Sequence, residues 1–92
     1  MISVELSQRF KKIVRKARRE AEVSATLKLV LQGFGQPHAH SGLAIRKLGK
    51  HLCECRTHLA WRLIFAAQKG VLTFDFAGDH DEVPVRSWLG RQ

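Results

Sequence analysis

The stretch that decides the fold runs from residue 52 to residue 83 and reads LCECRTHLAWRLIFAAQKGVLTFDFAGDHDEV. Its apolar residues alternate with polar ones, which indicates β-strands because successive side chains of a strand point to opposite faces. In the middle run Trp61, Leu63 and Phe65 share one face. With short connections at residues 58–60 and 69–70, the stretch predicts three consecutive antiparallel strands.

The second of these connections sets the pairing of the last two strands. A two-residue turn at Lys69-Gly70, where glycine supplies the positive φ, pairs Leu63 with Phe76. The same register keeps the large aromatic side chains on the core face. It places Asp75 opposite Ile64, on the other face of the sheet.

That other face carries charge. A three-residue connection at residues 58–60 sets Arg56 directly opposite Arg62, and Glu54 and Asp75 fall on the same face. Like charges in cross-strand pairs are unfavourable, so a compensating group is expected. One interpretation is a solvated face on which the carboxylates neutralise the arginines. The other is a site for an anion such as a phosphate, which two guanidinium groups suit by geometry and permanent charge.

The first third of the chain predicts a short strand over residues 2–6 and two helices. Ser7 is a suitable N-cap. The two apolar stripes that follow are rotated by roughly 120° from one another, so one straight helix cannot bury both. We therefore expect a helical hairpin broken between Arg19 and Ser24, with Gly33 ending the second helix.

Composition bounds the class of protein. The 92 residues are 45% hydrophobic, which predicts one small folded domain over residues 1–92. Sixteen Lys and Arg against eight Asp and Glu give a formal charge of +8, typical of a protein with a polyanionic partner. No apolar run is long enough to span a membrane and the start lacks a secretion signal, so a cytoplasmic protein without a membrane partner is expected.

The two cysteines, Cys53 and Cys55, are spaced CxC on one strand and make a poor disulfide pair. Free thiols fit a reducing cytoplasm. A metal site that adds His51 or His58 lacks a recognised ligand spacing. We therefore expect neither a metal nor a cofactor.

A histidine follows the last strand among carboxylates, in the run Gly78-Asp79-His80-Asp81-Glu82. Neighbouring negative charge favours the imidazolium and should raise the pKa of His80 above its usual value. The residue then suits general acid catalysis, or it is a turn histidine bonded to its neighbours. Residues 85–89 predict a short C-terminal element.

Four strings resemble the toxins of the RelE/ParE superfamily, found in bacterial type II toxin-antitoxin pairs: IRKLG (45–49), LCECR (52–56), WRLIF (61–65) and GDHDEV (78–83). The resemblance covers the second half of the chain closely and the first half by its order of elements. It implies a RelE-like α+β fold in the order β-α-α-β-β-β, with an antiparallel sheet packed against the helical hairpin and a short C-terminal element.

Resemblance to the ribosome-dependent members implies an endoribonuclease that cuts messenger RNA with the substrate's own 2′-hydroxyl as nucleophile. Arg62 matches the strand arginine that stabilises the scissile phosphate, and Arg56 matches a basic residue on the adjacent strand. His80 falls at a basic or histidine position. Glu54 matches a position that is acidic in some members and basic in others. The resemblance therefore leaves open a role for Glu54 as a general base.

The resemblance also implies partners, namely a cognate antitoxin, the ribosome and messenger RNA. Basic residues next to the RNA-binding surface correspond to Arg46, Lys47 and Lys50, and Arg86 is expected to join them. In one respect the chain departs from the family: it contains no tyrosine, although many active members carry one just after the position of Val83. A ParE-like inhibitor of DNA gyrase, or an inactive homologue that only binds an antitoxin, therefore stays open as an alternative.

Overall fold

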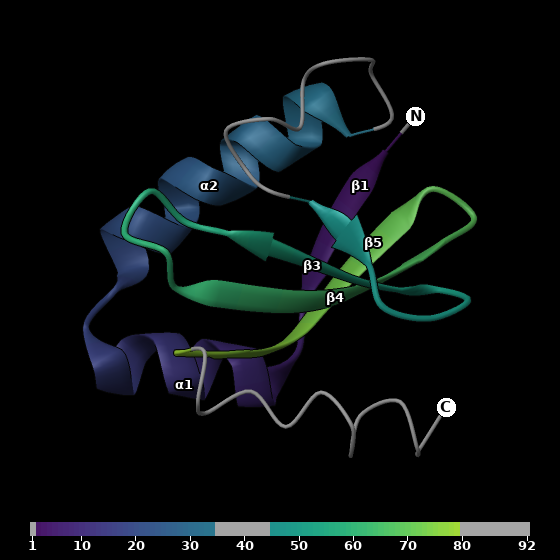
Figure 1. The fold of residues 1–92 in the computed structure, drawn as a ribbon. Helices are drawn as coiled ribbons and strands as arrows, with labels where there is room; N and C mark the ends of the chain where they lie inside the picture. The colour runs from purple at the N-terminus through teal and green to yellow at the C-terminus, as the bar shows by residue number, and fades with distance from the viewer. Residues whose placement is uncertain (1, 35–44, 80–92) are drawn as a thin grey trace.

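Two helices lie against one face of a five-stranded sheet in the computed structural model, which describes residues 2–34 and 45–79 (Figure 1). The elements are β1 (Ser3–Leu6), α1 (Gln8–Ala17), α2 (Glu20–Gly33), β2 (Arg46–Lys47), β3 (Leu52–Arg56), β4 (Arg62–Gln68) and β5 (Val71–Gly78). The predicted α+β class is confirmed, and the predicted order β-α-α-β-β-β is present with one added two-residue strand, β2. The C-terminal element predicted for residues 85–89 lies outside the described residues.

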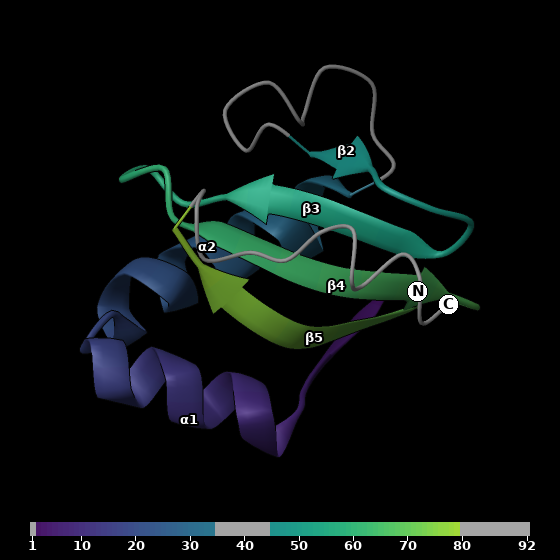
Figure 2. The same cartoon turned by 60° about the horizontal axis from the view of Figure 1, so that its bottom comes forward.

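The strands run in the order β1-β5-β4-β3-β2. The pairings of β3 with β4 and of β4 with β5 are antiparallel, as predicted. Two features differ from the expected sheet: β1 joins β5 in parallel, and β2 adds an antiparallel edge beside β3 (Figure 2). Parallel neighbours need a long crossover, and here the helical hairpin carries the chain from β1 to the opposite edge.

The hairpin of β3 and β4 has the predicted register. Arg56 pairs with Arg62, and Cys53 with Phe65. The connection closes with the Thr57 amide donating to the Trp61 carbonyl at 2.9 Å. Local sequence is enough to set this register because the loop is short.

The predicted pairing of Leu63 with Phe76 is wrong. A β-bulge shifts the register, so that Phe76 pairs with Ile64 and Ala77 pairs with Leu63. Asp75 is the extra residue of the bulge, and a bulge of one residue moves all later side chains to the opposite face. Phe76 consequently leaves the core face, where the smaller Ala77 is buried.

The turn between β4 and β5 is the predicted one. Lys69 and Gly70 both have positive φ, at 52° and 80°, as a two-residue hairpin turn requires. Lysine tolerates this conformation less well than glycine does, so closure of the hairpin holds it there.

The helical hairpin forms, but its corner lies earlier than predicted. α1 ends at Ala17 and α2 begins at Glu20. Arg18 takes the left-handed conformation (φ 56°, ψ 44°) that usually falls to glycine, and its amide donates to the Arg15 carbonyl at 3.1 Å. α2 ends at Gly33, as expected.

The main core fills the space between the helices and the sheet. Phe74 stacks on Phe65 with ring centroids 4.6 Å apart, and Phe10 of α1 packs against it at 5.7 Å. The opposite face carries a smaller apolar cluster: Leu52, Ile64, Leu48 and Phe76. Neither described helix is long and apolar enough to cross a membrane.

Loss of the α1 N-cap should destabilise the fold. The Ser7 hydroxyl accepts from the Phe10 amide at 3.0 Å, as predicted for an N-cap. We expect Ser7→Ala to lower the free energy of unfolding by about 1 kcal/mol in urea titration. Ser24→Ala on the exposed face of α2 is the matched control and should change it by less than about 0.5 kcal/mol. Equal effects of the two changes would contradict the cap assignment.

Candidate functional site

Three arginines and one glutamate meet on the sheet face away from the helices. Glu54 of β3 pairs with Arg46 of β2 on one side and with Ile64 of β4 on the other. Arg56 and Arg62 form the next row, also on this face. We call Arg46, Arg56 and Arg62 the arginine cluster.

Glu54 lies at the centre of the arginine cluster and has no exposed surface. Arg62 Nη1 donates to Glu54 Oε2 at 3.1 Å, and only 9% of the Arg62 side chain is exposed. Arg46 Nε lies 3.3 Å from Glu54 Oε1, and its side chain is 56% exposed. Glu54 is therefore the group that compensates the Arg56–Arg62 repulsion, and it does so by holding Arg62.

Two buried atoms of the site are unsatisfied. Among the described residues, Arg56 Nε and Glu54 Oε1 have no hydrogen-bond partner. The Oε1 contact with Arg46 is thus an ion pair without hydrogen-bond alignment. Three guanidinium groups against one carboxylate leave an excess of two positive charges, which favours binding of an anion.

Asp75 does not join this face as predicted. Because of the bulge it meets α1, where Arg9 Nη2 lies 2.9 Å from Asp75 Oδ2 and Arg9 Nε donates to the Asp75 carbonyl. The Arg9 guanidinium also lies 5.2 Å from the Phe76 ring centroid. The second carboxylate expected to neutralise the arginines is therefore engaged elsewhere.

The remaining predicted residues divide by position. Arg46 belongs to the arginine cluster, as described. Lys47 pairs with Cys53, so it falls on the helix side of the sheet, and Lys50 is exposed in the connection from β2 to β3. His80 and Arg86 lie outside the described residues.

A second polar cluster ties the β3–β4 hairpin to α2, and sequence reasoning missed it. Glu22 accepts from the Thr57 hydroxyl and from Arg19, whose Nη1 lies 3.1 Å from Glu22 Oε1. The Arg19 guanidinium sits 4.9 Å from the Trp61 ring centroid. Thr57 and Glu22 are 35 positions apart in sequence, so no local pattern could reveal their contact.

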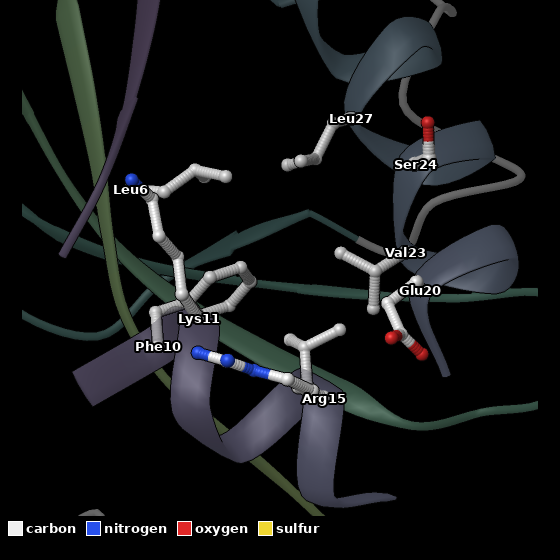
Figure 3. Close-up of a pocket in the computed structure, with 9 residues that line it drawn as sticks. Leu6, Phe10, Lys11, Arg15, Glu20, Val23, Ser24 and Leu27 are labelled. Carbon is white, nitrogen blue, oxygen red and sulfur yellow. The ribbon is translucent and has the colours of Figure 1, made fainter. Parts of the chain in front are cut away.

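An open groove of about 410 Å³ separates the two helices (Figure 3). Val23 and Leu27 of α2 face Leu6 and Phe10 across it. The remaining lining residues are Lys11, Val14, Arg15, Glu20 and Ser24. The groove is thus apolar inside, and its charged lining residues are Lys11 and Arg15 of α1 and Glu20 of α2.

Both cysteines are free and buried. Burial, with the neighbouring Glu54 and Cys53 charges, raises the pKa of Cys55 from 9.0 to about 12, and burial also raises the pKa of Cys53. Within residues 2–34 and 45–79, no group of three or more His, Cys, Asp and Glu side chains could hold a metal ion.

The buried thiols predict a stability loss in alkali. Between about pH 9 and pH 12 the unfolded chain releases the Cys55 proton while the native chain keeps it, so unfolding becomes more favourable as pH rises. One such thiol contributes a slope of at most about 1.4 kcal/mol per pH unit. Urea unfolding from pH 8 to pH 10.5 should show a shallower decline for Cys55→Ala than for the native chain. Identical slopes would contradict the assignment.

No protein-family model and no curated protein matches the chain. Among solved structures, the crystal structure of YafQ from E. coli strain BL21(DE3) is similar, with a TM-score of 0.64 and 21% sequence identity. The match covers 88% of this chain and 96% of that one. At this identity the likeness is one of fold, and it confirms the predicted RelE-like α+β architecture.

Proposed function

We propose that the chain is the toxin of a toxin-antitoxin pair and cuts messenger RNA on the ribosome. The observation that carries this proposal is the cross-strand pair Arg56–Arg62 on the sheet face away from the helices, with the buried carboxylate of Glu54 beside it. Two guanidinium groups held on rigid neighbouring strands match a phosphate in geometry and charge. This arrangement favours a phosphate site over a merely solvated sheet face.

The chemistry requires stabilised charge at the phosphate and two proton transfers. The 2′-hydroxyl gives up its proton to water and attacks the adjacent phosphorus, while the bond from phosphorus to the 5′-oxygen of the next nucleotide breaks. Negative charge develops on the phosphoryl oxygens beside Arg56 and Arg62. Donors aimed at such charge typically contribute about 10² to 10³ in rate each. His80 is the proposed general acid for the leaving oxygen.

The formal charge of +8 supports an RNA target. Cations that contact phosphates release condensed counterions, and this gives affinity without sequence preference. Arg46, Lys47, Lys50 and Arg86 are the proposed contacts with RNA or the ribosome. Specificity for a codon would then come from the ribosome's presentation of the message.

The groove between the helices supports a protein antitoxin as partner. An amphipathic helix can place apolar side chains between Phe10 and Val23, and acidic residues on it would meet Lys11 and Arg15 at the rim. Such a segment would also neutralise part of the excess charge.

The absence of tyrosine favours a second candidate function. A phenol can take part in proton transfer, and Trp88, the aromatic residue near that position in sequence, cannot replace it in this role. A ParE-like gyrase inhibitor, or a homologue that only binds an antitoxin, needs no phosphate-cleaving set. In those cases the only role of the Glu54–Arg62 pair would be to stabilise the sheet.

Primer extension on a defined message bound to purified ribosomes tests the proposal. The native chain should produce new cuts that are absent on naked RNA. Arg56→Ala, Arg62→Ala and His80→Ala should each slow cutting by about 10² to 10³, since each removes a charge or proton donor at the phosphate. Lys28→Ala removes one exposed charge from α2 and is the matched control, expected to cut normally.

The absence of cuts at high concentrations of the native chain would sink the nuclease assignment. Inhibition of gyrase supercoiling would then support the gyrase-inhibitor function, and antitoxin binding alone would support the inactive homologue. Thermal unfolding of each variant separates lost chemistry from lost structure.

A further inference from the structure

Glu54 is the least exposed charged group of the site, and it contacts two of the three arginines in the cluster. We infer that Glu54 is a positioning residue that orients Arg62 for the substrate phosphate, while Arg56 makes the primary phosphate contact. The inference rests on the proposed function and assigns roles within that site. It replaces the role of general base that the family resemblance left open for Glu54.

The burial of Glu54 argues against a base. A general base must reach the proton that it removes, directly or through one water. Glu54 has no exposed surface, and both of its carboxylate oxygens lie against guanidinium groups, at 3.1 Å and 3.3 Å. A substrate hydroxyl would have to displace an arginine to arrive there.

The contact with Arg62 is of the kind that fixes a guanidinium plane. Arg62 uses Nη1 to bind Glu54 Oε2, and the planar group carries five donors in all, so others stay free for a ligand. With 9% of its side chain exposed, Arg62 has little freedom to leave this orientation. Outer-shell contacts of this type orient the groups that touch substrate.

Arg56 has the complementary property. Its Nε atom is buried and lacks a hydrogen-bond partner among the described residues, although Arg62 stands directly opposite on the next strand. A buried donor without a partner is costly, and a phosphate oxygen bound between the two guanidinium groups would satisfy it. Arg56 is therefore the donor of the pair that is not already engaged by Glu54.

Glu54→Gln separates positioning from the other roles because it keeps shape and an acceptor oxygen while it removes the charge. The positive excess of the site rises from two to three, so affinity for RNA should hold or tighten. Loss of the Arg62 orientation should still slow the chemical step, by about 10-fold to 100-fold as for other outer-shell contacts. Slower turnover without weaker binding is the signature of positioning.

The test compares three chains: the native chain, Glu54→Gln and the exposed control Glu5→Gln. Each is assayed for cutting of ribosome-bound message under single-turnover conditions across a range of pH. We expect Glu54→Gln to lower the maximal rate 10-fold to 100-fold, with no rise in half-saturating concentration and the same shape of pH profile. If Glu54→Gln no longer shows the fall in rate at low pH that the native chain shows, the inference is overturned and Glu54 is a general base. An unchanged rate, or a matching loss of affinity, would overturn it in favour of a purely structural role.

A second measurement stands even if the native chain cuts no RNA, and so separates failure of the inference from failure of the proposed function. In side-chain NMR, the Arg62 guanidinium should rotate slowly in the native chain and freely in Glu54→Gln. Inorganic phosphate should shift the Arg56 and Arg62 signals in both chains, with affinity no weaker in the variant. Free rotation of Arg62 in the native chain, or phosphate shifts that omit Arg56, would overturn the inference.

Glu54→Asp keeps the charge and withdraws it by one methylene, which guards against a Glu54→Gln chain that fails to fold. We expect it to slow cutting less than Glu54→Gln does and to leave Arg62 partly restrained. A rate below that of Glu54→Gln in a variant with native unfolding temperature would contradict positioning by the carboxylate.

Discussion

The buried ion pair between Glu54 and Arg62 is the interaction on which the sheet face away from the helices depends. A carboxylate without exposed surface is tolerated only when its charge is paired, and Arg62 supplies the aligned hydrogen bond. Removal of either partner leaves the other buried and unpaired, which typically costs about 3–5 kcal/mol. The same pair allows Arg56 to stand opposite Arg62, because one of the two like charges is already neutralised.

The β-bulge at Asp75 completes this arrangement from the other side of β4. Without the extra residue, Asp75 would lie opposite Ile64 and add a second carboxylate beside the arginines. The bulge sends Asp75 to Arg9 instead and brings Phe76 opposite Ile64. The site therefore combines an apolar neighbour with an uncompensated positive charge, a combination that attracts an anion and strengthens its contacts by excluding water.

The parts of the fold that were predictable from sequence are those set by local constraints. A short loop places Arg56 opposite Arg62, and Lys69-Gly70 closes the next hairpin, so alternation alone gives both connections. The bulge was not predictable, because Asp75 and Phe76 alternate as a regular strand would. The contact of Arg46 with Glu54 was also hidden, since β2 has only two residues and no periodicity. The complete burial of Glu54 was hidden as well, because its contacts with Arg46 and Arg62 join three different strands, which no sequence window contains.

The lack of a tyrosine does not conflict in chemical terms with the proposed cleavage of RNA. Guanidinium groups stay protonated at all accessible pH values, so the charge that Arg56 and Arg62 bring to a phosphate does not depend on a neighbouring phenol. Proton transfer is a separate requirement, and the pH dependence of cutting would report only the groups that perform it. In the proposed reaction, electrostatic stabilisation by the arginines and proton transfer by His80 are thus separable contributions. A chain that keeps the first and has lost the second would still bind its target while it cuts slowly.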